Sequence, residues 1–188
     1  RVDVLREDEK MYVRVVDYKS SMKNLTIDDI KDGISLQLMT YLDAFLQNQR
    51  LLQKNKVIPA GCVYFNLSNN LVNLKDYTKD EISIKKEVIK SLRLRGIFLS
   101  DVNILEKMDK KIESSDEKLI DISKTRLDSS KKALSEDEFN NLCSEVTEIL
   151  KKIGNDMIKG IVTVSKNKKG EHCKYCDYQS ICRKNSLV

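Results

Sequence analysis

The stretch VRVVDYKSS, from Val13 to Ser21, is an alternating apolar run that ends in an acid and a base two residues apart. Residues i and i+2 of a β-strand point to the same side, so Asp17 and Lys19 share one face and Tyr18 points to the other. The apolar residues before Asp17 predict that its face is buried until the strand ends. The stretch therefore predicts a charged pair at the rim of a β-sheet.

An earlier apolar run, Val2 to Leu5, is separated from this stretch by polar residues and predicts the first strand of a β-hairpin. If the chain turns near Lys10, Asp3 lies beside Asp17 on the neighbouring strand. A turn centred on Asp8 and Glu9 shifts that pairing by about three residues. The expected neighbourhood of the two carboxylates therefore depends on the position of the turn.

Two adjacent carboxylates repel one another and are most stable around a hard divalent cation such as Mg²⁺ or Mn²⁺. Asp3 and Asp17 would be the ligands, and the backbone carbonyl of Tyr18 would add a third oxygen. Lys19 would then orient a water molecule or stabilise charge on a phosphate. Taken alone, however, Asp17 and Lys19 are more typical of an exposed ion pair of little energetic importance.

The remaining pattern predicts further helices and strands around this hairpin. After a loop over residues 20–33, the predicted elements are a helix over 34–52, a strand over 62–67 following Pro59 to Gly61, a helix over 80–95 that Gly96 ends as a C-cap, and a short strand near 119–122. Ser135 and Glu138 form a capping box at the start of a helix that continues to Gly160. A last strand is expected over residues 161–164.

The composition fits one folded domain over residues 1–188. No apolar stretch approaches the roughly 20 residues needed to cross a bilayer, which predicts a soluble, cytoplasmic protein without membrane contact. The net charge of +5 is compatible with a nucleic-acid partner but does not prove one. Arg1 stands where a Met would begin a complete chain and falls within a predicted strand, so we expect a fragment of something longer.

Three of the five cysteines lie in a tail over residues 171–184, as Cys173, Cys176 and Cys182. This spacing indicates metal binding in a reducing compartment rather than a disulfide framework. A zinc site with His172 as a further ligand is one interpretation of the same residues.

Three segments, RVDV, VRVVDYKSS and SLQLMTYLDAF, together resemble the nuclease module of the PD-(D/E)xK superfamily found in RecB and AddB proteins, above all the C-terminal domain of the AddB type. The resemblance implies an α/β fold with a restriction-endonuclease-like core, a mixed central sheet flanked by helices. It also implies catalytic roles for Asp3, which matches the G-x-x-D acid, and for Asp17 and Lys19, which match D-x-K. Gln37 and Tyr41 match Q-x-x-x-Y, and their i, i+4 spacing puts them on one face of a helix.

What the resemblance implies is a Mg²⁺-dependent (or Mn²⁺-dependent) deoxyribonuclease domain. It would act on single-stranded DNA during double-strand break processing, in a heterodimer with a helicase-nuclease A subunit. Two alternatives remain open at this point. One is a free-standing CRISPR-associated exonuclease with the same core, and the other is a non-catalytic DNA-binding module that needs no metal.

The resemblance also implies that Cys173, Cys176 and Cys182 join one upstream cysteine to hold a [4Fe-4S] cluster. Cys62 and Cys143 do not fit the missing ligand, because their surroundings predict a strand and a helix in which small buried thiols are common. The family's fourth cysteine lies ahead of the hairpin. We therefore expect these 188 residues to hold the cluster incompletely or not at all.

Overall fold

The computed structural model describes residues 1–52, 54–67, 81–127, 130–162, 176–178 and 180–182. The chain divides into two compact units, Arg1–Thr147 and Glu148–Val188, and each is described by itself. The first unit contains the sheet and the predicted site. The expectation of one domain over the whole chain stays a prediction.

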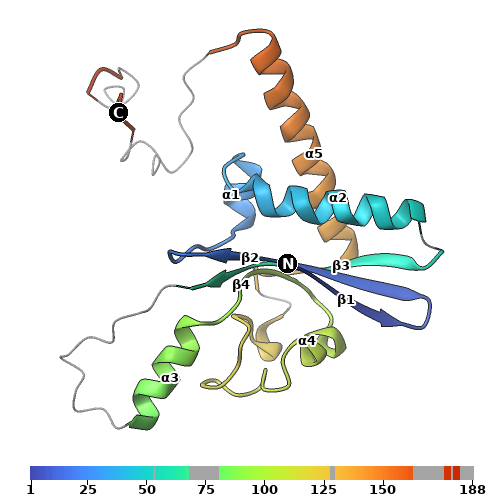
Figure 1. Ribbon diagram of the computed structural model, residues 1–188, viewed down its shortest axis with the longest axis vertical. Coiled ribbons are helices and arrows are strands. Elements are labelled where there is room, and N and C mark those ends of the chain that lie inside the picture. The colour runs from blue at the N-terminus through green and yellow to red at the C-terminus, as the bar shows by residue number, and fades with distance from the viewer. Residues whose placement is uncertain (53, 68–80, 128–129, 163–175, 179, 183–188) are drawn as a thin grey trace. The chain divides into compact units, whose positions relative to one another are not determined.

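A five-stranded sheet in the order β1-β2-β3-β4-β5 organises the first unit (Figure 1). The strands are β1 (Val2–Glu7), β2 (Lys10–Lys19), β3 (Lys56–Asn66), β4 (Arg95–Leu99) and β5 (Ala133–Leu134). The pairs β1-β2 and β3-β4 are antiparallel, whereas β2-β3 and β4-β5 are parallel. This mixed sheet, with helices on both sides, confirms the predicted α/β restriction-endonuclease-like fold.

The β1-β2 hairpin turns at Asp8 and Glu9, with Asp8 in the left-handed region at a φ of 48°. Short polar side chains such as Asp tolerate this conformation better than most. The turn sets a register in which Asp3 lies opposite Arg14. The hairpin is thus confirmed, and its strands are longer than the apolar runs that predicted them.

Strand β3 begins six residues earlier than predicted and includes Pro59, Ala60 and Gly61. The ladder to β2 pairs Val13 with Pro59 and then Arg14 with Gly61, so Ala60 is an extra residue in a β-bulge. A bulge accommodates a proline, which has no N–H to donate to the ladder. Pro59 to Gly61, which were expected to precede the strand, are therefore part of it.

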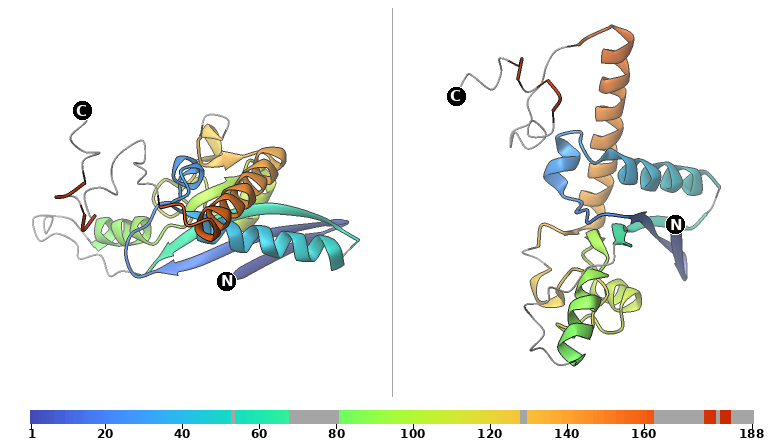
Figure 2. Two further views of the ribbon diagram at one scale, coloured as in Figure 1. Left: turned by 90° about the horizontal axis from the view of Figure 1, so that it is seen from above. Right: turned by 60° about the vertical axis from the view of Figure 1, so that its left-hand side comes forward.

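Helix α2 (Leu36–Leu52) covers one face of the sheet, and α4 (Val102–Met108) covers the other (Figures 1 and 2). We call these the α2 face and the α4 face. On the α2 face, Val13 and Val15 of β2 pack with buried residues of α2 and of the start of helix α5 (Glu136–Ile158). On the α4 face, Val16 packs with residues of α4 and of the segment that follows it. Successive residues of β2 thus enter different cores, as strand geometry requires.

The helices flanking the sheet begin where the sequence provides caps. The predicted loop contains a short helix, α1 (Ile27–Lys31), which Thr26 caps by accepting a hydrogen bond from the Asp29 amide at 3.1 Å. The capping box of α5 (Glu136–Ile158) is confirmed, since the Ser135 amide donates to Glu138 at 2.8 Å and the Glu138 amide to Ser135 Oγ at 3.3 Å. Gly160, at a φ of 65°, follows the end of α5.

The middle of the chain departs most from the prediction. Helix α3 (Glu81–Ser91) ends four residues before the predicted limit, and Gly96 lies inside β4 rather than at a helix C-cap. The predicted strand near 119–122 is a single bridge between Leu94 and Ile120. A short 3₁₀ turn (Lys124–Arg126) follows it.

At the end of the chain, Ile161 and Val162 form no strand, and the rest of the predicted last strand lies outside the described residues. None of the helices that the structure describes combines the length and the apolar character needed to span a membrane.

Candidate active site

The carboxyl ends of β2 and β3 meet at one rim of the sheet. Asp17 of β2 pairs with Tyr64 of β3, and Lys19 pairs with Asn66. Asp17 and Lys19 follow Val13 and Val15 by even steps, so they lie on the α2 face where the buried core ends. The predicted charged end of the strand is therefore at the rim of the sheet.

Asp17 and Lys19 form an ion pair, with Lys19 Nζ 2.7 Å from Asp17 Oδ2. Both side chains are 29% exposed, so the pair is open on one side. Asp17 Oδ2 is buried and accepts no well-aligned hydrogen bond, which leaves the ammonium as its only close polar partner among the described residues. A carboxylate held by one flexible lysine can take a new cationic partner without breaking a larger network.

Gln37 and Tyr41, one turn apart on α2, extend this pair. Lys19 Nζ lies 3.5 Å from Gln37 Oε1, at the limit of a hydrogen bond, and Gln37 Nε2 donates to the Tyr41 hydroxyl at 3.0 Å. Tyr41 is 53% exposed, which is unusual for an aromatic residue in an apolar stripe. The structure thus brings four of the five predicted catalytic side chains into one chain of contacts: Asp17, Lys19, Gln37 and Tyr41.

Tyr64 is a neighbour that the sequence pattern alone did not assign to the site. Lys19 Nζ lies 5.5 Å from the centroid of its ring, within reach of a cation-π interaction. Burial raises the pKa of the Tyr64 hydroxyl, and the neighbouring Cys62 and Asp17 raise it further. The alternation in the sequence of β3 could have predicted this position, because Val63 and Phe65 share one face of the strand and Tyr64 lies on the other.

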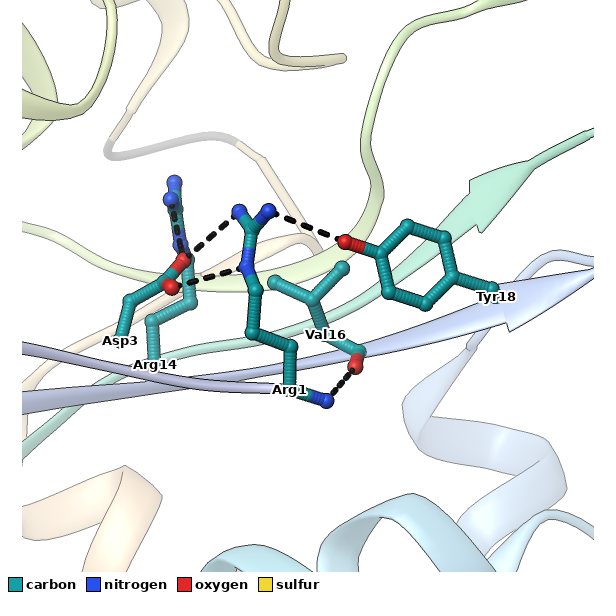
Figure 3. A network of polar contacts seen from close by, with 5 residues as sticks. All are labelled: Arg1, Asp3, Arg14, Val16 and Tyr18. Carbon is teal, nitrogen blue, oxygen red and sulfur yellow. Dashed lines mark hydrogen bonds and ion pairs between the residues drawn. The ribbon is translucent and has the colours of Figure 1, made fainter.

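Asp3 lies away from this group, and its predicted place beside Asp17 is wrong. Asp3 is opposite Arg14, which is three residues from Asp17 and so points to the other face of β2. Figure 3 shows Asp3 between the guanidinium groups of Arg1 and Arg14. Its Oδ2 accepts from Arg14 Nη2 at 2.7 Å, and its Oδ1 lies 2.9 Å from Arg1 Nε. The prediction that Asp3 binds a metal together with Asp17 depended on the two carboxylates being neighbours, and in the structure they are not.

The charge around Asp3 differs from that around Asp17. Burial acts to raise the pKa of the Asp3 carboxyl, but hydrogen bonds from Arg14 and Arg1 and their charges outweigh it, so the pKa falls below its ordinary value. The Tyr18 side chain belongs to the same group, since its hydroxyl accepts from Arg1 Nη1 at 2.9 Å (Figure 3). A role for the Tyr18 carbonyl as a metal ligand stays a prediction.

The donor chemistry at Asp17 fits one ligand of a hard divalent cation. Mg²⁺ is commonly held by one or two carboxylates, with water and substrate phosphates completing its shell. Across the described ranges, no group of three or more acidic, histidine or cysteine side chains is arranged around a metal site. In the observed register β1 pairs from Val2 with Val15 onward, so no residue of β1 in the described ranges lies opposite Asp17.

The described cysteines differ in how far they are exposed to solvent. Cys62 in β3 and Cys143 in α5 are buried, and burial is the main cause that raises the pKa of the Cys62 thiol well above its usual value and that of Cys143 to about 12. Both thiols pack within the apolar core on the α2 face, as small buried cysteines commonly do. In the tail, Cys176 is exposed and Cys182 half-buried, both as free thiols, and Cys173 lies outside the described residues, as does His172. The described residues therefore do not by themselves fit a [4Fe-4S] cluster.

Comparison with known proteins identifies the family to which the sequence is similar. The sequence pattern of the PD-(D/E)XK nuclease superfamily matches residues 1–183. Relatives named as the B subunit of an ATP-dependent helicase/deoxyribonuclease include proteins of Alkaliphilus metalliredigens, 37% identical over 97% of this chain, and of Clostridium kluyveri, 38% identical over all of it. A further one, from Clostridium acetobutylicum, is 32% identical over the whole chain. The chain spans only 16–17% of the length of these relatives.

Proposed function

The chain belongs to the PD-(D/E)XK nuclease superfamily, and we propose that it hydrolyses DNA phosphodiester bonds at Asp17 with the help of a divalent cation. The observation that carries this proposal is the chain of contacts from Asp17 through Lys19 to Gln37 and Tyr41. These are the residues that the D-x-K and Q-x-x-x-Y motifs match. They come from two separate elements and meet at an open rim.

Each residue has a role that its surroundings support. Asp17 would hold Mg²⁺ or Mn²⁺, which, when bound, polarises the phosphate and lowers the pKa of a bound water. Lys19 would turn from Asp17 toward the substrate and stabilise negative charge on the phosphate oxygens. Gln37 orients Lys19 through its amide oxygen, and Tyr41 holds the amide of Gln37 in that orientation.

The substrate we propose is single-stranded DNA, delivered by a helicase partner during the processing of double-strand breaks in the cytoplasm. Support comes from the names of the relatives, which join a helicase to a deoxyribonuclease activity. The open rim at Asp17 and the net charge of +5 are compatible with a polyanionic strand. The helicase-nuclease A subunit is the partner that this proposal implies.

Metal removal and one lysine substitution test the proposal. The natural-length protein with its helicase partner is expected to cleave end-labelled single-stranded DNA with Mg²⁺ and to stop in EDTA. Lys19→Met is expected to lower kcat by about 10²-fold, because the charge that faces the phosphate is lost. Lys31→Met removes an equal charge from an exposed pair with Glu145 and is the matched control. Cleavage that persists in EDTA, or equal rates in both variants, would contradict the proposal.

For the tail, we propose that Cys173, Cys176 and Cys182 bind a [4Fe-4S] cluster only together with a fourth thiol from elsewhere in the protein. Iron and sulfide analysis of the 188-residue chain is expected to find less than one four-iron cluster per chain. A full cluster in this chain alone would show that the expectation is wrong. No step of the cleavage reaction depends on this cluster.

A further inference from the structure

A row of three side chains crosses the sheet at the rim of the site. Asp17 of β2 pairs with Tyr64 of β3, and Tyr64 pairs in turn with Arg95, the first residue of β4. Directly paired residues point to the same face, so all three lie on the α2 face. Ile97, two residues along β4 from Arg95, confirms this by packing with Tyr64 in the α2-face core. Two strand spacings of about 4.8 Å put Arg95 about 10 Å from Asp17 across the sheet.

The Arg95 guanidinium has unused hydrogen-bonding capacity. Within the described residues, its only hydrogen bond runs from Nη1 to the thioether sulfur of Met22 at 3.3 Å, and thioethers are weak acceptors. Its Nε is buried without a hydrogen-bond partner, and no acidic side chain in the described ranges forms an ion pair with Arg95. By contrast, Arg14 pairs with the carboxylate of Asp3, although its own Nη1 is also buried without a partner, and Arg93 donates to the carbonyls of Lys118 and Ser115.

The backbone holds Arg95 firmly in this position. The next residue, Gly96, packs so closely on β3 that a Cβ there would lie 2.2 Å from the Cys62 carbonyl oxygen. Only glycine allows this approach, which fixes the start of β4 beside Tyr64. A cation anchored on a strand is held more precisely than one on a loop. The charges of Asp17 and Lys19 largely cancel one another, and within the described residues no acid pairs with Arg95, so Arg95 adds a positive charge at this rim.

We propose that Arg95 binds a backbone phosphate of the DNA strand next to the phosphate that is cleaved at Asp17. The inference rests on the proposed nuclease function and adds a substrate contact on the far side of Tyr64 from Lys19. Because Nε is buried, the phosphate oxygens would be bound by the N–H groups of the terminal nitrogens Nη1 and Nη2, with Nη1 exchanging the weak Met22 sulfur for a charged oxygen. Arg95 thereby sets the position of the strand across the rim.

Three variants of the natural-length protein test this contact. Arg95→Met is expected to raise KM for single-stranded DNA by about 10-fold with a smaller change in kcat. The dependence of log K on log salt, measured for binding in the Asp17→Asn background, should become shallower by about 0.7, the value for one phosphate on a single strand. Arg95→Lys keeps the charge and should keep the slope, with a smaller rise in KM. Lys107→Met removes a charge on the α4 face and should change neither quantity.

The outcomes separate this inference from the proposed function. An unchanged KM and salt slope in Arg95→Met overturns the phosphate contact, and so does a fall in kcat alone. If Asp17→Asn abolishes cleavage in the same series, the nuclease proposal stands whatever Arg95 does. Unchanged cleavage in Asp17→Asn overturns the nuclease proposal instead. Should Arg95→Met fail to fold, Arg95→Gln takes its place, and the same two measurements decide.

Discussion

Two aspartates on one β-hairpin face opposite sides of the sheet and have opposite surroundings. On the α4 face, Asp3 is held by the guanidinium groups of Arg14 and Arg1. On the α2 face, Asp17 meets the single ammonium of Lys19 and lies beside the Gln37 and Tyr41 pair. The comparison teaches that strand register, rather than distance along the sequence, decides the surroundings of each acid. Asp3 is held by two guanidinium groups, whereas Asp17 has one ammonium partner and can accept another cation.

The largest expected effect compares the two acids directly. Asp17→Asn is expected to lower the cleavage rate at least about 10²-fold, because the amide is a poor ligand for a hard cation and leaves Lys19 unpaired. Asp3→Asn is expected to leave the rate within about 2-fold of the unsubstituted protein, because Asp3 faces away from the site. Steady-state cleavage of single-stranded DNA measures both. Equal losses of cleavage rate in Asp17→Asn and Asp3→Asn would show that the two faces of the sheet do not differ in function.

A second test concerns the close contact that positions β4. Gly96→Ala is expected to destabilise the fold by about 3 kcal/mol, since the new methyl group meets the backbone of Cys62 and Val63 rather than a flexible side chain. Gly154→Ala is the matched control, because nothing lies within 4 Å of a Cβ there. Helix propensity predicts a gain of about 0.5–1 kcal/mol in that control. Urea unfolding curves would show whether Gly96→Ala lowers the free energy of unfolding while Gly154→Ala raises it.

A third test asks whether a buried acid on the α4 side serves structure alone. Asp109 is 4% exposed, and its carboxylate accepts from the amides of Lys111, Leu119 and Ile120 at 2.6–3.3 Å. Asp109→Asn is expected to lower stability by about 2 kcal/mol, because one acceptor becomes a donor facing backbone N–H groups. Cleavage by the folded fraction should not change. A loss of cleavage without a loss of stability would contradict this assignment.

The exposed Asp116 is the control for that test. It pairs with Lys86 and Lys90 across the surface, and Asp116→Asn should leave the unfolding midpoint unchanged.

The smallest expected effect is the pH dependence that Asp3 gives to stability. Its folded-state pKa lies below its ordinary value, so its contribution is complete above about pH 4 and is lost as the pH falls through the folded pKa. The stability difference between the unsubstituted chain and Asp3→Asn should therefore shrink on acidification. Unfolding curves at about pH 6 and about pH 3, on either side of the ordinary pKa of an aspartate, measure it. A difference that grows toward low pH would show that Arg14 and Arg1 do not stabilise the carboxylate.

The parts of the fold and site that the sequence predicted are those set by local spacing. The i, i+2 pair of Asp17 and Lys19 and the i, i+4 pair of Gln37 and Tyr41 lie as predicted, because strand and helix geometry fix such pairs without long-range information. The capping box at Ser135 is local in the same sense. Whether these residues act in catalysis stays a prediction.

What the sequence did not predict depends on pairing between distant segments. The expected place of Asp3 beside Asp17 was wrong because the turn at Asp8 and Glu9 shifts the hairpin by three residues, an odd number that exchanges the faces. Arg95 was missed because Gly96 resembled a helix stop. Its real role, a close approach between β3 and β4, depends on the position of Cys62.

The parallel pairing of β2 with β3 also has a consequence for folding order. The hairpin of β1 and β2 closes over a two-residue turn, but β2 and β3 pair only after the 36-residue connection that carries α1 and α2 has folded back. Such long-range closure is slow compared with local hairpin formation. Asp17, Gln37, Tyr64 and Arg95 come from four different elements and meet only after that step. A partly folded chain would therefore have every residue of the rim without the arrangement that the proposed site requires.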